Sequence, residues 1–197
     1  MSTLALRDLK LLNFKTNSGF WLYLMTDCIL FASLFATYIV LHGGTAGGPT
    51  SRDIFELPMA LTETIILLTS SFTCGLALLA LRQENLKQLV VWLGVTYVLG
   101  IAFLTIELTE FSSLIQAGHG WQQSAFLSAF FTLVGTHGLH IFIGLLWLFT
   151  MVIVLFKRGF TPKLKRQLGL FALFWHFLDL VWIFIFTVVY LMGVMPS

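Results

Sequence analysis

The sequence predicts an all-α integral membrane protein, a bundle of five transmembrane helices with its N-terminus in the cytoplasm and its C-terminus outside. Three observations predict this fold: the apolar composition, the long stretches without charged residues, and the position of the basic loops. Of the 197 residues, 58% are hydrophobic and 10% are charged, whereas an ordinary soluble domain has about 45–50% and about 25%. A soluble globule of this length could not bury so much apolar surface. The composition therefore excludes a soluble enzyme and a nucleic-acid-binding protein.

The charge-free stretches place the helices. Asp, Glu, Lys and Arg are absent from residues 28–51, 64–81, 88–106, 111–156 and 180–197. Since a span needs about 20 mostly apolar residues, we expect helices near 19–42, 58–81, 88–115, 125–156 and 167–195. They form one domain, 19–195, after a cytoplasmic segment, 1–18. The polar, glycine-rich residues 118–124 indicate a loop, so the fourth stretch holds one span. The four prolines lie at or outside the predicted ends, which favours unbroken helices.

Basic residues set the predicted orientation. The N-terminal segment and the loops after the second and fourth helices hold all but one of the lysines and arginines, and the other loops hold only Arg52. By the positive-inside rule the N-terminus is cytoplasmic. The first apolar stretch is longer than that of a signal peptide and contains Asp27, so we expect it to remain as a helix. Cys28 and Cys74 lie in apolar runs and are predicted to be buried free thiols.

Ionisable residues inside the predicted helices are the candidate functional residues, because such a group costs several kcal/mol in the bilayer unless it is paired. They are Asp27, Glu63, Glu107, Glu110, His137, His140, His176 and Asp179. Three pairs have i, i+3 spacing and so share a helix face. The helical rise of about 1.5 Å per residue puts the glutamates nearer the outer surface and the other residues from mid-membrane to the inner half. We therefore expect Asp27 to pair with His140 or His176.

Several interpretations of these residues stay open. They can hydrogen-bond across helices and fix the bundle, hold lipid head groups, or form a proton relay. A metal site lacks the Glu-x-x-His motif of four-helix di-iron proteins, and five histidines are too few for a histidine-rich membrane oxygenase. Haem ligation would need His137 or His140 opposite His176, because two histidines on one helix face cannot bind both sides of one haem.

Two motifs carry a resemblance to a known family. The segments Thr136–Ile141 (THGLHI) and Phe174–Trp182 (FWHFLDLVW) resemble the paired signature of subunit III of haem–copper terminal oxidases. The resemblance extends from Gly19 to Gly193. Asp27 matches a membrane carboxylate that is usually glutamate in the family, and Glu107 and Glu110 match its E-x-x-E. Residues 43–50 and 53–58 resemble in particular the subfamily of bacterial cytochrome o ubiquinol oxidases. Many members have seven helices, and this chain matches them from the third onward.

The resemblance implies a subunit without redox centres, with no catalytic residue and no cofactor or metal of its own. Haems and copper are then expected in subunit I, the main partner, beside other subunits and phospholipids. Arg82 and Lys87 are candidates for lipid head-group contacts. The subunit would support assembly, lipid binding and stable proton uptake in a proton-pumping ubiquinol oxidase of a bacterial inner membrane, with its C-terminus periplasmic. The alternatives are subunit III of a bacterial cytochrome c oxidase and an independent membrane metalloenzyme. An unrelated transporter is disfavoured, because five helices do not divide into two equal halves.

Overall fold

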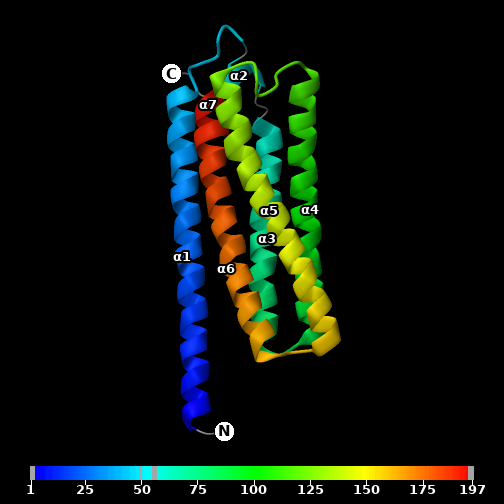
Figure 1. Ribbon diagram of the computed structural model, residues 1–197. Coiled ribbons are helices and arrows are strands. Elements are labelled where there is room, and N and C mark those ends of the chain that lie inside the picture. Colours follow the sequence, from blue (N-terminus) through cyan, green and yellow to red (C-terminus); the bar gives the residue numbers. More distant parts are fainter. Residues whose placement is uncertain (1–2, 49, 55–56, 195–197) are drawn as a thin grey trace.

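The computed structural model describes residues 3–48, 50–54 and 57–194, and every regular element in these ranges is a helix. Five long helices stand side by side as a bundle (Figure 1). They are α1 (Thr3–Leu41), α3 (Leu57–Arg82), α4 (Leu86–Gln116), α5 (Ala125–Arg158) and α6 (Pro162–Ile185). The short elements are α2 (Ser51–Ile54) and two continuations of α6, the π-helical η1 (Phe186–Leu191) and α7 (Met192–Val194). Each long helix contains a span long and apolar enough to cross a membrane, which confirms the predicted five-helix, all-α fold.

Local sequence signals explain where the helices begin and end. Side-chain oxygens of Asn85, Ser124 and Thr161 accept a hydrogen bond from the backbone N–H three residues later, and these caps start α4, α5 and α6. The chain leaves α5 at Gly159 with a φ of 65° and a ψ of −157°, a conformation that favours glycine. Pro162 occupies the first turn of α6, where its missing N–H breaks no helical bond.

Two predicted boundaries differ from the observed ones. Helix α1 begins at Thr3 rather than near residue 19, so the predicted cytoplasmic segment is helical from Thr3 onward. Residues 3–18 contain no glycine or proline that would end a helix. Helix α6 begins at Pro162 rather than near residue 167, because the Thr161 cap lies among charged residues that a search for apolar runs excludes.

The last span contains a π-helical turn that the proline positions did not predict. From Phe186 to Leu191 the backbone is π-helical, and a π turn adds a residue to the hydrogen-bonded ladder and changes the direction of the side chains in it. The final helix nevertheless runs without interruption from Pro162 to Val194, so the prediction of an unbroken helix holds and only the helical geometry changes over this turn. Tyr190 lies within it, and its hydroxyl donates to Oε2 of Glu110 at 3.0 Å.

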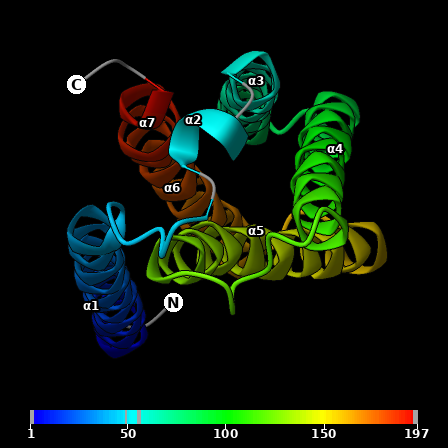
Figure 2. The ribbon, with the colours of Figure 1, turned by 90° about the horizontal axis from the view of Figure 1, so that it is seen from above.

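Helix α6 packs against three other long helices, α1, α3 and α5. Seen along the bundle, α1 stands at one edge, and α3 and α4 lie side by side away from it (Figure 2). The buried interior is rich in aromatic side chains, including Trp175, Trp182, Tyr190, Phe103, Phe126 and Phe130. Large apolar side chains also remain on the outside, as a membrane protein requires. Cys74 is buried as predicted, but Cys28 is exposed and lines an open apolar pocket between α1 and α6.

The connecting turns lie at the ends that the charge pattern predicts. Turns 83–85 and 159–161 lie at the end where α1 begins, and residues 42–48 and 117–124 lie at the opposite end with α7 (Figure 1). At the first end, Nζ of Lys165 donates a hydrogen bond to Oε1 of Glu84. The two basic turns are therefore in contact on one side of the bundle.

Candidate functional site

The ionisable side chains of the spans lie in separate interhelical contacts rather than in one centre. The structure brings together Asp27 with His140, the glutamates Glu63, Glu107 and Glu110, and His176 with Asp179, while His137 stands among aromatic rings. All eight face the bundle or a pocket between helices.

Asp27 and His140 face each other between α1 and α5. Asp27 is 8% exposed, and its Oδ1 lies 3.7 Å from Nε2 of His140. This distance suits an ion pair but exceeds that of a hydrogen bond. Nδ1 of His140 donates to the backbone oxygen of Thr136 at 2.7 Å, so a proton between the two side chains lies on Nε2 or on the carboxyl group. The expected pairing of Asp27 with a histidine is confirmed for His140.

His137 occupies the aromatic core and is fully buried. Its ring centroid lies 5.3 Å from that of Trp182, 5.9 Å from that of Phe103 and 6.3 Å from that of Phe31. Within the described ranges neither ring nitrogen has a hydrogen-bond partner. His137 therefore packs as an aromatic ring among other rings. This packing explains its burial better than binding of a metal or haem does.

Three glutamates form an acidic cluster between α3 and α4. Glu63 is 0% exposed and Glu107 is 2% exposed, and their carboxyl groups interact electrostatically with each other and with Glu110. Tyr190 donates a hydrogen bond to Glu110, whereas neither oxygen of Glu63 has a hydrogen-bond partner among the described residues. Because an uncompensated charge in the membrane is costly, the cluster needs protons or an additional donor to stay buried.

Helix α5 makes room for this cluster at Gly138. A Cβ atom there would lie 2.4 Å from Oε1 and 2.7 Å from Oε2 of Glu107. The carboxyl group of Glu107 therefore packs on the α5 backbone, at the level of His137. The predicted separation in depth between the glutamates and the histidines is wrong for Glu107. The prediction counted the depth of each Cα along the helix axis, whereas the carboxyl group of a glutamate lies several bonds from its Cα.

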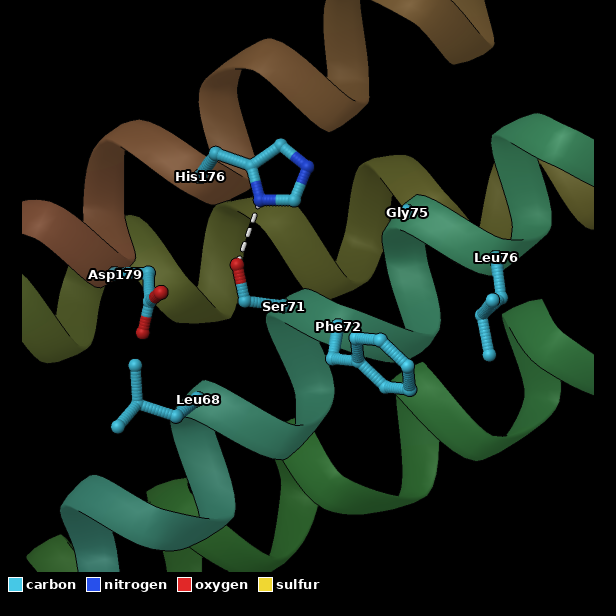
Figure 3. A pocket seen from close by; sticks show the side chains of 7 residues that line it. All are labelled: Leu68, Ser71, Phe72, Gly75, Leu76, His176 and Asp179. Atoms are coloured by element: carbon cyan, nitrogen blue, oxygen red, sulfur yellow. Dashed lines mark hydrogen bonds between the residues drawn. The ribbon is translucent and has the colours of Figure 1, made fainter.

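Ser71, His176 and Asp179 line a pocket of about 320 Å³ between α3 and α6 (Figure 3). Oγ of Ser71 lies 2.6 Å from Nδ1 of His176, so His176 pairs with α3 rather than with Asp27. Asp179 is 9% exposed, and its Oδ1 has no hydrogen-bond partner in the described part of the chain. The pocket rim carries Leu68 and Phe72, which are 43% and 67% exposed. His176 is exposed in this pocket, so a group on another molecule can approach its imidazole here, whereas the unpartnered oxygen of Asp179 is buried behind it.

Two hydroxyl groups of α3 that bind α6 were not among the predicted site residues. Nε1 of Trp175 donates to Oγ of Ser70 at 3.1 Å, and Nε1 of Trp182 donates to Oγ1 of Thr64 at 3.0 Å. These bonds join two helices and satisfy indole N–H groups inside the membrane. The polar run of residues 69–73 within an apolar helix was a signal for Ser70, whereas Thr64 lies outside that run and has no such signal.

The arrangement supports proton holding and helix cohesion. Among the described residues, no three or more His, Cys, Asp or Glu side chains converge as a metal-binding group. The Asp27–His140 pair and the acidic cluster can each hold or release protons, because their members are ionisable and lie within electrostatic range of one another.

The comparison with known proteins identifies the family. The sequence matches the family described as cytochrome c oxidase subunit III over residues 9–194. The chain belongs to this family. It is 57% identical to cytochrome bo(3) ubiquinol oxidase subunit 3 of Pseudomonas aeruginosa over 179 residues, which is 91% of this chain and 86% of the relative. The same-named protein of Pseudomonas putida is 54% identical, with coverages of 90% and 86%. Cytochrome c oxidase subunit 3 of Bacillus sp. strain PS3 is 47% identical, with coverages of 89% and 84%.

The family match confirms the resemblance carried by the two motifs. Both motif segments and all eight candidate residues lie inside the matched range. The motifs contribute His140, which faces Asp27, and His176 and Asp179, which line the α3–α6 pocket. The two motif segments of this chain therefore place polar side chains at two distinct contacts, one between α1 and α5 and one between α3 and α6.

Proposed function

We propose that this chain is subunit III of a proton-pumping cytochrome o-type ubiquinol oxidase in a bacterial inner membrane. The complex oxidises ubiquinol and reduces O2 to water, while the haems and copper are held by subunit I. This chain contributes no catalytic residue or cofactor and supports assembly, lipid binding and stable proton uptake. The observation that carries the proposal is the identity of 57% and 54% with two cytochrome bo(3) ubiquinol oxidase subunits 3, over 91% and 90% of this chain.

The proposed orientation has a cytoplasmic N-terminus and a periplasmic C-terminus. Turns 83–85 and 159–161 and the start of α1 share one end of the bundle. That end carries ten of the eleven lysines and arginines, and basic loops stay on the cytoplasmic side of the membrane.

Subunit I is the proposed main partner, and the α3–α6 pocket supports a contact there. Asp179 has a buried oxygen without a hydrogen-bond partner within the described ranges, and His176 is exposed beside it. Acyl chains offer no hydrogen bond to the exposed imidazole of His176, whereas a transmembrane helix with a polar side chain does. This face of the bundle therefore suits another protein better than lipid.

The remaining polar residues have proposed structural and proton-linked roles. Asp27 and His140 form the proton-linked pair between α1 and α5, and Glu63, Glu107, Glu110 and His137 hold α3, α4 and α5 together. Arg82 and Lys87, which are exposed at the turn between α3 and α4, bind phospholipid phosphates by charge-assisted contacts.

Purification of the tagged chain in mild detergent tests the function. A large haem-bearing chain should co-purify, and the complex should oxidise ubiquinol but not reduced cytochrome c. Turnover of reduced cytochrome c would favour the alternative, subunit III of a bacterial cytochrome c oxidase. Metal bound to the isolated chain, or recovery without any haem-bearing partner, would contradict the proposal.

Photo-cross-linking tests the proposed contact surface in the assembled complex. A benzophenone side chain is placed at Phe72, on the rim of the α3–α6 pocket, and as a control at Val98 on α4, which is 65% exposed. We expect position 72 to cross-link to subunit I and position 98 to cross-link to lipid. Lipid adducts alone at position 72 would show that another face meets subunit I.

A further inference from the structure

The turn between α5 and α6 forms a second pocket, distinct from the polar groups inside the bundle. Its volume is about 600 Å³, and its polar wall includes Lys157, Arg158, Thr161 and Lys163. The turn lies at the end of the bundle where α1 begins (Figure 1). It is also remote in sequence from Arg82 and Lys87, the head-group candidates at the turn between α3 and α4.

The cations of this pocket have no acidic partner in the described part of the chain. Lys157, Arg158 and Lys163 are exposed, and none of them forms an ion pair there. Residues 111–178 contain no aspartate or glutamate. Glu84, the acid that reaches this turn from the neighbouring one, is bound to Lys165 instead. Three positive charges therefore remain available at one pocket.

The other wall of the pocket is aliphatic. Ile153 and Val154 line it from the last turns of α5 and are 38% and 37% exposed. They belong to the predicted membrane span of α5, so the pocket combines a cationic wall at the membrane surface with an apolar wall toward the hydrocarbon. This combination matches the phosphate and the first acyl carbons of a phospholipid.

We propose that the pocket at residues 153–167 binds the phosphate head group of an anionic phospholipid, with Lys157, Arg158 and Lys163 pairing its charge. The hydroxyl of Thr161 contributes a further donor, because its oxygen already accepts the N–H of Leu164 while its O–H can point to the phosphate. The net negative charge of a phosphatidylglycerol head group matches the three unpaired cations better than a zwitterionic phosphatidylethanolamine does. The inference depends on the membrane placement in the proposed function and not on the substrate of the oxidase.

Native mass spectrometry of the purified complex, reconstituted with phosphatidylglycerol or with phosphatidylethanolamine, tests this site. Neutral variants Lys157→Gln, Arg158→Gln and Lys163→Gln are compared with Lys15→Gln, which removes one exposed lysine from α1 at the same end of the bundle. We expect each pocket variant to bind phosphatidylglycerol roughly fivefold more weakly, the change typical of one charge near an anionic surface. Lys15→Gln should bind it like the unchanged protein, and Lys163→Arg should retain binding.

The outcomes separate the lipid site from its alternatives. Equal retention of the two lipids, or equal retention by the pocket variants and the control, would overturn the inference. Displacement of phosphatidylglycerol by millimolar inorganic phosphate would show a free-anion site and would also overturn it. If a variant fails to assemble, a benzophenone at Val154 with all cations intact gives a second readout, since it should cross-link phosphatidylglycerol in preference to phosphatidylethanolamine.

Haem content and ubiquinol turnover are measured in parallel. If the oxidase assignment fails in these measurements, the lipid-binding result can still be interpreted on its own.

Discussion

The carboxyl group of Glu107 packs against the backbone of Gly138, so closely that a Cβ atom at position 138 would lie 2.4 Å from Oε1. Small residues commonly let transmembrane helices approach each other. Here the glycine of α5 makes room for a buried acidic side chain of α4. The distance between these two helices therefore depends on where the carboxyl group of Glu107 lies.

This contact predicts that Gly138→Ala destabilises the bundle. The added methyl group forces the Glu107 carboxyl or α5 to move, and such overpacking costs about 1–3 kcal/mol. The midpoint of thermal denaturation of the purified complex measures the loss. Gly94→Ala in α4 is the control, because a Cβ atom there meets nothing within 4 Å. Equal stability of the two variants would mean that Glu107 moves aside without cost.

The hydroxyl of Tyr190 is predicted to stabilise the acidic cluster. Tyr190→Phe removes the hydroxyl that donates to Oε2 of Glu110, and the net loss of one hydrogen bond costs about 0.5–1.5 kcal/mol. Denaturation of the complex in rising detergent or heat compares this variant with Tyr97→Phe. The ring of Tyr97 stacks on that of Phe149 at 6.3 Å, so the control also removes one hydroxyl from an aromatic contact. A loss no larger than that of the control would contradict the role of the Tyr190 hydrogen bond.

Hydropathy and charge predicted the fold because each span is a stretch of about 20 apolar residues, the helix length needed to cross the membrane. A signal of that length can be read directly from the sequence. A contact between Asp27 and either His140 or His176 could be predicted because such residues are rare inside a bilayer and lie at similar depths, but depth did not choose between the two histidines. The Glu107–Gly138 contact could not, since it depends on which helix faces meet and on how far a side chain reaches. The bonds from Trp175 and Trp182 to α3 escaped prediction for the same reason, and the π turn that directs Tyr190 has no proline or glycine to mark it.

Asp27 and His140 are predicted to be energetically coupled. Asp27→Ala leaves the imidazole without its partner, and His140→Ala does the same to the carboxyl group, so the double variant should lose less stability than the sum of the two. For residues in contact the coupling is typically about 0.5–3 kcal/mol. The matched control is the cycle of Asp27→Ala with His176→Ala, which should be additive because His176 binds Ser71 on another surface. Coupling of Asp27 to His176 and not to His140 would contradict the observed pairing.

The contact between Glu84 and Lys165 predicts a small pH-dependent stabilisation at the basic end of the bundle. The hydrogen bond from Lys165, and then its positive charge, lower the pKa of Glu84 from its ordinary value. Folding therefore favours the carboxylate, and the stabilisation is complete above the unfolded pKa of about 4.3 and is lost as the pH falls through the lower folded value.

The denaturation midpoints of the unchanged protein and of Glu84→Gln should accordingly differ near neutral pH and converge as the pH falls through the lowered pKa of Glu84 in the folded protein. Because Glu84 is exposed, the difference should be small and should also shrink in concentrated salt. In a Lys165→Gln background, Glu84→Gln should have no effect at either pH. A difference that grows on acidification, or that survives both salt and removal of Lys165, would show that Glu84 acts through another partner.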